Sequence, residues 1–153
     1  MQEMSTDRSI SLGYNFCVNS PEAAPNSHRA KHHRQMGNIS FMLLRRNLTK
    51  FEVLHKQLLN DKKMETPVRG RVETCFQLYS LAIFDAKEAF QDYNAKRYHD
   101  SNTRVSAVSN APVTCEDGFK EIQGLVSPLI KMNNVTYRVS AISLAIVTMF
   151  SLE

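Results

Sequence analysis

The chain of 153 residues has the length of one ordinary domain and can bury one sizeable core. Hydrophobic residues make up 42% and charged residues 22%, as in a soluble globular protein, and only five Gly and five Pro argue against a turn-rich β fold. The net charge of +4 is unevenly spread, because residues 28–71 carry 11 Lys/Arg and 3 Asp/Glu while the rest carries 8 and 12. The basic region is either a solvated helix face or a contact for an acidic partner.

The N-terminal residues 1–26 are predicted to form an irregular extension, followed by the folded domain at residues 27–153. The opening stretch is polar and shows no signal peptide. The two prolines of "NSPEAAPNS" indicate a linker, after which Ser27 offers a helix N-cap. Up to about Asn60, apolar residues then recur in steps of three and four, which predicts one helix face made of Met36, Ile39, Leu43, Leu44, Leu48, Phe51, Leu54 and Leu58.

A second helix is expected from Thr66, an N-cap residue that is followed by Pro67. Its apolar positions repeat every seven residues, which is typical of a bundle helix: Val68, Val72, Cys75, Tyr79, Ala82, Ala86, Ala89 and Tyr93. After a connection at residues 93–100, the repeat resumes in a third helix at Tyr98, Ser101, Val105, Val108, Pro112, Cys115 and Phe119. Pro112 is expected to kink this helix or to end it early.

The C-terminal part is expected to contain a loop at residues 124–134 and a last helix. The inward positions of that helix are Val135, Val139, Ile142, Ile146 and Met149. The most apolar stretch, residues 139–150, is too short for a bilayer, which takes roughly 20 apolar residues. Four amphipathic helices with short connections predict an all-α, up-down-up-down antiparallel four-helix bundle without membrane association.

Cys75 and Cys115 fall on the core-facing positions of two consecutive helices. Phe119 shares the inward stripe of Cys115, whereas Glu116 and Asp117 are expected to point outward. A disulfide between neighbouring helices fits this arrangement, and two reduced core thiols are the alternative. Closing the loop would stabilise the fold by about 4 kcal/mol. A metal site is disfavoured, because neither cysteine has a Cys or His at ligand spacing.

Three stretches resemble one protein family: "YNFCV" (14–18), "RYHDSNTRVSAVSNAPVTCEDGFKE" (97–121) and "GLVSPLIKMNN" (124–134). Together with "AISLAI" (141–146), they are similar to the plant invertase and pectin methylesterase inhibitors, and above all to pollen-allergen-like invertase inhibitors. The resemblance implies a four-helix bundle preceded by an N-terminal helical hairpin. It also implies two disulfides, of which Cys75 and Cys115 match one. Cys17 matches half of the other, and no cysteine precedes it, so the hairpin is expected to be degraded and Cys17 unpaired.

The resemblance also implies a target-binding site and a function. A Pro-Lys-Phe turn of the invertase inhibitors matches Lys96, Arg97 and Tyr98, where the cation and the ring persist and the proline does not. An arginine can bind a target carboxylate and a ring can fill a sugar subsite. The alternative is a solvated turn with Tyr98 packed inward. The expected function is inhibition of an acid invertase (β-fructofuranosidase) by a monomer in the cell wall or vacuole. Inhibition of pectin methylesterase is one alternative, and a non-inhibitory, allergen-like pollen protein is another.

The remaining motifs add little chemistry. His28 and His32 stand one helical turn apart, but the surrounding cations favour a solvated face over a metal site. A basic patch without interleaved aromatic residues does not indicate nucleic-acid binding. Of three glycosylation sequons, the one at Asn134 is preferred because it lies at a loop–helix junction. No catalytic set stands out, so we expect a non-enzyme without cofactor or metal.

Overall fold

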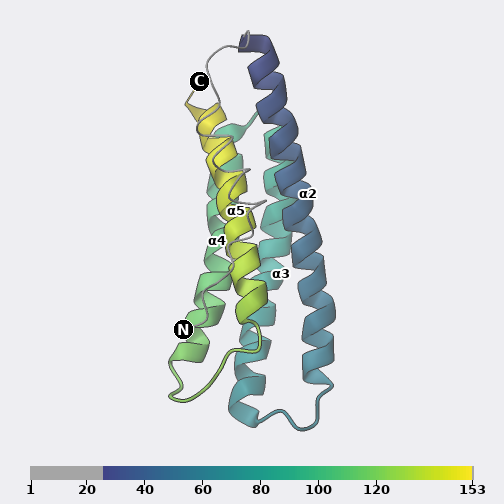
Figure 1. The fold of residues 1–153 in the computed structure, drawn as a ribbon, viewed down its shortest axis with the longest axis vertical. Coiled ribbons are helices and arrows are strands. Elements are labelled where there is room, and N and C mark those ends of the chain that lie inside the picture. The colour runs from purple at the N-terminus through teal and green to yellow at the C-terminus, as the bar shows by residue number, and fades with distance from the viewer. Residues whose placement is uncertain (1–25, 153) are drawn as a thin grey trace.

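The computed structural model of the protein describes residues 26–152, and within this range the chain is a bundle of four helices without strands (Figure 1). The helices are α2 (Asn26–Leu59), α3 (Thr66–Asn94), α4 (Tyr98–Lys120) and α5 (Ile130–Ser151). Each helix runs antiparallel to the next and packs against two neighbours, since α2 contacts α3 and α5, and α4 contacts α3 and α5. The predicted all-α, up-down-up-down bundle is therefore confirmed. The predicted hairpin and Cys17 lie outside the described residues.

The buried side chains of the described residues form two clusters, which occupy different parts of the bundle. The larger cluster surrounds the disulfide between Cys75 and Cys115, whose Cα atoms lie 4.9 Å apart. Both cysteines are buried, which confirms the predicted bond between α3 and α4. The smaller cluster is rich in aromatic rings and fills the other end, where Tyr93 is fully buried and Phe41 is 3% exposed.

Several helix boundaries differ from the expected ones. α2 begins at Asn26, one residue before the expected cap Ser27, and α3 begins at Thr66 itself, with Glu65 in the capping position. α4 continues through Pro112 to Lys120, so the proline does not end the helix. α5 begins at Ile130, so residues 130–134 of the expected loop at 124–134 belong to this helix. Only the backbone position of each boundary changes, and the order of the helices is as expected.

The inward faces of α2 and α5 also differ from the apolar stripes. Ile39 and Val135 are 56% and 42% exposed, although both were expected to face the core. Small polar residues replace them there: Ser40, Asn47, Thr136, Ser140 and Ser143 are all buried. A hydroxyl in a helix can donate to a carbonyl one turn earlier, as Thr136 does to Met132 (2.9 Å) and Ser143 does to Val139 (3.1 Å). Such residues enter a core without leaving a polar group unpaired.

Candidate functional site

The candidate site is the short turn between α3 and α4, at the end of the bundle where α5 also ends (Figure 1). Only residues 95–97 separate the two helices. Lys96 adopts the left-handed backbone conformation, with φ of 60°, which is uncommon for a residue with a Cβ atom. The turn is closed by hydrogen bonds from the Lys96 amide to the Tyr93 carbonyl (3.1 Å) and from the Arg97 amide to the Asp92 carbonyl (2.8 Å). Lys96 is exposed.

The cation Arg97 is held by the carboxylate of Asp92, which is only 7% exposed. Arg97 donates to Asp92 Oδ1 through Nε (2.9 Å) and Nη2 (2.6 Å), while its side chain remains 55% exposed. The other carboxylate oxygen of Asp92 accepts a bond from Arg104 Nε (3.1 Å), and Arg104 also lies 3.5 Å from Asp85. The buried carboxylate thus ties the turn to both α3 and α4.

Tyr98, the third predicted residue, is half-buried. Its ring stacks on Phe150 of α5 with 5.0 Å between centroids and meets Tyr93 edge-on at 5.8 Å. Its hydroxyl accepts a hydrogen bond from Nη1 of Arg34 on α2 (3.1 Å). The structure therefore exposes Lys96 and Arg97 together, whereas Tyr98 packs inward and fixes the turn to α2 and α5.

Arg34 and Gly37 of α2 complete the support of the turn, and the sequence patterns did not identify either of them. Arg34 donates through Nη2 to the carbonyl of Asn94 (3.0 Å), the last residue of α3. Tyr93 donates its hydroxyl to the Arg34 carbonyl (3.1 Å), an approach that only glycine permits, since a Cβ at Gly37 would lie 2.1 Å from that hydroxyl. Burial raises the pKa of Tyr93 to about 12, against the opposing effect of Arg34, so the phenol stays neutral and donates.

The other half of the bundle holds a buried polar network beside the disulfide. Asn133 of α5 is 3% exposed and donates to Glu116 Oε2 (2.7 Å) and to Cys115 Sγ (3.2 Å). The side-chain oxygen of Asn133 accepts a hydrogen bond from the Tyr79 hydroxyl (2.8 Å), and burial is the main cause that raises the pKa of Tyr79. Glu116 was expected to point outward, but it is half-buried and pairs with Asn133. The network joins α3, α4 and α5, and its members have structural partners.

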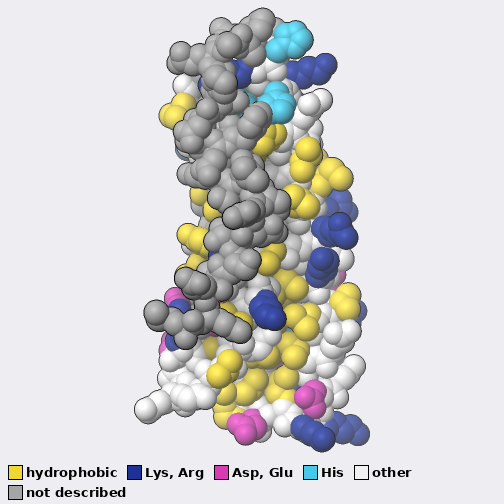
Figure 2. All heavy atoms as spheres, viewed as in Figure 1, with side chains coloured by type: hydrophobic (Ala, Val, Ile, Leu, Met, Phe, Trp, Pro, Cys, Tyr) yellow, Lys and Arg dark blue, Asp and Glu magenta, His cyan; other side chains and the backbone are white. Residues whose placement is uncertain are grey.

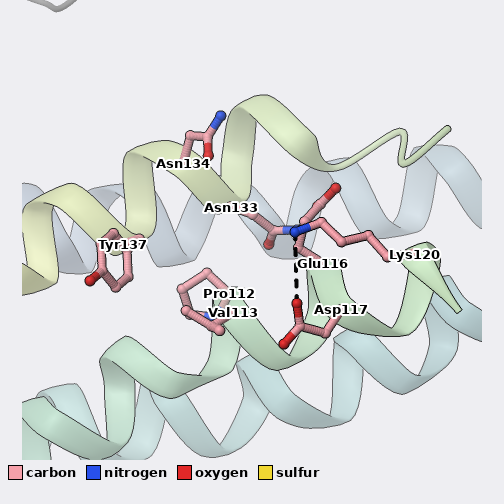
Figure 3. Close-up of a pocket in the computed structure, with 8 residues that line it drawn as sticks. All are labelled: Pro112, Val113, Glu116, Asp117, Lys120, Asn133, Asn134 and Tyr137. Atoms are coloured by element: carbon pink, nitrogen blue, oxygen red, sulfur yellow. Dashed lines mark hydrogen bonds and ion pairs between the residues drawn. The ribbon is translucent and has the colours of Figure 1, made fainter.

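A shallow pocket of about 190 Å³ lies between α4 and α5 over this network (Figure 3). Lys120 and Asp117 form an ion pair at 3.8 Å at one side of it, and Asn134 stands at its rim. Asn134 belongs to the second turn of α5 and is half-buried, rather than lying at a loop–helix junction. Asn47, in another sequon, is buried and donates to the Thr136 hydroxyl, which leaves no room for a glycan there.

The described residues contain no group of three or more His, Cys, Asp or Glu side chains placed to hold a metal ion. In residues 26–152, no helix is both long and apolar enough to cross a membrane. The described residues form a helical bundle with one disulfide between α3 and α4 and an exposed cationic turn at one end. By its fold, the protein belongs to the class of four-helix bundles.

Comparison with known proteins names the family. Residues 5–146 match the family model described as plant invertase/pectin methylesterase inhibitor, and the chain belongs to this family. The "Putative invertase inhibitor" of Platanus acerifolia is 37% identical over 139 residues, covering 91% of this chain and 76% of that protein. The protein of the same name from Platanus orientalis is also 37% identical over 139 residues, covering 91% and 81%. "Pectinesterase inhibitor 12" of Arabidopsis thaliana is 28% identical over 102 residues, covering 67% and 58%.

Solved structures show the same fold. A mutant form of a pectin methylesterase inhibitor from Arabidopsis superposes with a TM-score of 0.73 at 18% identity, over 92% of this chain and 88% of that one. A pectin methylesterase inhibitor from Arabidopsis thaliana gives a TM-score of 0.70 at 20% identity, over 86% and 83%. Both are inhibitors of the same fold, and the family is one of enzyme inhibitors.

Proposed function

We propose that this protein inhibits an acid invertase and acts by binding the enzyme, not by catalysis. The observation that carries the proposal is the α3–α4 turn, where Lys96 and Arg97 stand exposed on a support formed by Asp92 and Tyr98. The two relatives at 37% identity that are named invertase inhibitors align with 91% of the chain.

The turn has the chemistry to enter a glycosidase cleft. Retaining glycosidases hold two carboxylates about 5–5.5 Å apart, so their cleft attracts cations. Lys96 has no side-chain partner among the described residues, and its ammonium is free to approach a carboxylate. Arg97 uses Nε and Nη2 for Asp92, which leaves Nη1 for a second, target carboxylate. Tyr98 can offer only the exposed part of its ring to a sugar subsite, so its main contribution is to hold the turn.

The contacts that hold the turn in place reduce the conformational entropy that it loses on binding. A flexible loop would lose conformational freedom on entering a cleft, whereas a pre-ordered turn loses little. While Nη1 of Arg97 binds a target carboxylate, Nε and Nη2 can stay on Asp92, and Arg104 neutralises Asp92 through the other oxygen. The buried charge therefore keeps a partner in both states.

The test is an inhibition assay on cell-wall invertase with single substitutions. Lys96→Ala and Arg97→Ala should each weaken inhibition strongly. Lys62→Ala is the matched control, because Lys62 is an exposed cation in the α2–α3 loop at the opposite end of the bundle (Figure 1). If both turn variants inhibit as well as the control, the turn is not the contact.

Pectin methylesterase is the second candidate target, favoured by the Arabidopsis thaliana relative and by the two solved inhibitors. In that case the outer faces of the helices would cover the substrate cleft, and the turn variants would have little effect. The same variants are therefore assayed on both enzymes. If the protein inhibits neither enzyme, the third alternative, a non-inhibitory protein, is favoured.

The setting of this function is part of the proposal. We place the protein in the cell wall or vacuole, as a monomer that carries a glycan on Asn134. Expression in plant cells followed by peptide mapping should find that glycan, and Asn47 should be unmodified because its amide is buried. Size-exclusion chromatography with light scattering tests the monomer.

A further inference from the structure

A second hollow lies between α2 and α3, its lining includes none of the turn residues 95–97, and the proposed inhibition does not use it. It holds about 350 Å³, which is within the range of about 300–1,000 Å³ typical of small-molecule pockets. Its lining runs from residue 41 to 49 on α2 and from 83 to 91 on α3. At 1.5 Å per residue, eight steps along each helix give a groove about 12 Å long.

The floor of this α2–α3 groove is apolar. Phe41 and Leu48 of α2 are almost fully buried beneath it, and Phe90 of α3 closes one side, with its ring 5.4 Å from that of Phe41. The hollow exists because α3 places the small side chain of Ala86 opposite these larger ones. Contact with an apolar guest would remove further hydrocarbon surface from water.

The rim of the groove is basic from both sides. Arg45 of α2 and Lys87 of α3 line it, both are exposed, and neither forms an ion pair within the described residues. No acidic residue contributes to the lining. Figure 2 shows hydrophobic and basic side chains next to one another along the edge of the molecule that α2 forms. An apolar floor between two unpaired cations is complementary to a molecule with one apolar chain and one anionic group.

We propose that the α2–α3 groove binds a medium-chain anionic amphiphile. The apolar chain lies on Phe41, Leu48 and Phe90, and the carboxylate lies between Arg45 and Lys87. A carboxylate can accept bonds from both cations, since the guanidinium offers a planar fork and the ammonium three donors. A neutral chain of the same length gains only the apolar contact, and a cationic one is repelled.

Calorimetric titration of the full chain with decanoate, below its micelle concentration, tests the proposal. Decanoate should bind at one saturable site, decanol more weakly, and decylammonium not measurably. Arg45→Glu and Lys87→Glu should each weaken decanoate binding by about fivefold, the upper end of the contribution of an exposed ion pair. Ala86→Leu should abolish binding by filling the hollow, with circular dichroism confirming the fold.

Arg46→Glu is the matched control, because it makes the same charge change one residue away from Arg45 and does not line the groove. It should leave decanoate binding unchanged. The proposal is overturned if decanoate shows no saturable binding, if decanol binds equally well, or if Arg46→Glu weakens binding as much as Arg45→Glu. It is also overturned if the groove variants lose enzyme inhibition while decanoate never binds, since the groove would then belong to the target interface.

Discussion

Replacing Arg97 by Ala should separate the role of the turn in binding from its role in folding. In the free protein, the substitution removes two donors from Asp92 Oδ1 but leaves Arg104 on Oδ2. Hydrogen bonds to charged groups contribute about 1.5–3 kcal/mol, and exposed ion pairs about 0–1 kcal/mol. Since the Arg97 side chain is 55% exposed, we expect a loss near 1 kcal/mol, or about 2–4 °C in melting temperature.

The effect of Arg97→Ala on inhibition should be much larger. Removing one partner of a buried charge pair costs about 2–5 kcal/mol of binding. At about 1.4 kcal/mol per factor of ten, the inhibition constant should rise by about thirty-fold to several thousand-fold. Melting followed by circular dichroism and inhibition measured on the same samples give both quantities.

Arg104→Ala provides the control, because it also removes one partner of Asp92 but lies behind the turn. It should lower the melting temperature by a similar amount and leave inhibition largely intact. Asp92→Ala removes the carboxylate shared by Arg97 and Arg104 and leaves Arg104 only Asp85, so it should cost about 2 kcal/mol, or about 4–8 °C. The reasoning would be refuted if Arg104→Ala and Arg97→Ala reduced inhibition equally, since Arg97 would then act only through stability.

Three further sets of substitutions test the fold of the bundle. Removing the disulfide with Cys75→Ala and Cys115→Ala should cost about 4 kcal/mol for the 40-residue separation, and lower the melting temperature by about 8–16 °C. Tyr98→Phe should melt near the wild type because it loses only the Arg34 bond, whereas Tyr98→Ala should melt clearly lower because it loses the stacking on Phe150. Burial lowers the pKa of His55 below 6.5, against a raising effect of Glu73, so the unfolded chain takes up the proton first as the pH falls. The contribution of neutral His55 to stability is therefore complete above pH 6.5 and is lost as the pH falls below it. In a pH series of melting curves, the melting temperature should decline less toward low pH for His55→Leu than for the wild type.

The helix that the sequence predicted best is α3. All its heptad positions from Val72 to Tyr93 are buried, and Cys75 forms the disulfide. This success has a physical reason, because the stripe of α3 consists of apolar residues and alanines that have no alternative to the core. The seven-residue repeat of α3 therefore predicted its buried residues correctly. The disulfide between Cys75 and Cys115 followed from the antiparallel order of the helices.

The stripes of α2 and α5 were predicted less well, because they mix polar and apolar residues. Counting only hydrophobic residues assigned Ile39 and Val135 to the core, whereas Ser40 and Thr136 next to them are the buried ones. A buried hydroxyl depends on a carbonyl of its own helix or on a partner across the bundle, such as the contact between Ser143 and Ser40 (3.0 Å). Residues 103 positions apart carry no mutual signal in a single sequence.

The position of the turn was predictable, but the interactions that support it were not. Two charged residues five positions apart, Asp92 and Arg97, do not match the spacings of three and four that favour pairing on one helix. They meet only because Lys96 adopts a positive φ, which brings the chain back over the end of α3. Arg34 was read as one cation of a basic stretch, and only the bundle brings it to Tyr98.

The division of the core into two clusters has a consequence for how the protein combines stability with binding. The disulfide and Asn133 lie in one half of the bundle, while the aromatic cluster and the turn occupy the other end. Substitutions at distant sites without shared partners usually act additively. Loss of the disulfide should therefore lower the fraction of folded protein without altering the bond between Arg97 and Asp92. Inhibition per folded molecule should then persist in the cysteine variants, because the turn is held by local contacts of its own end.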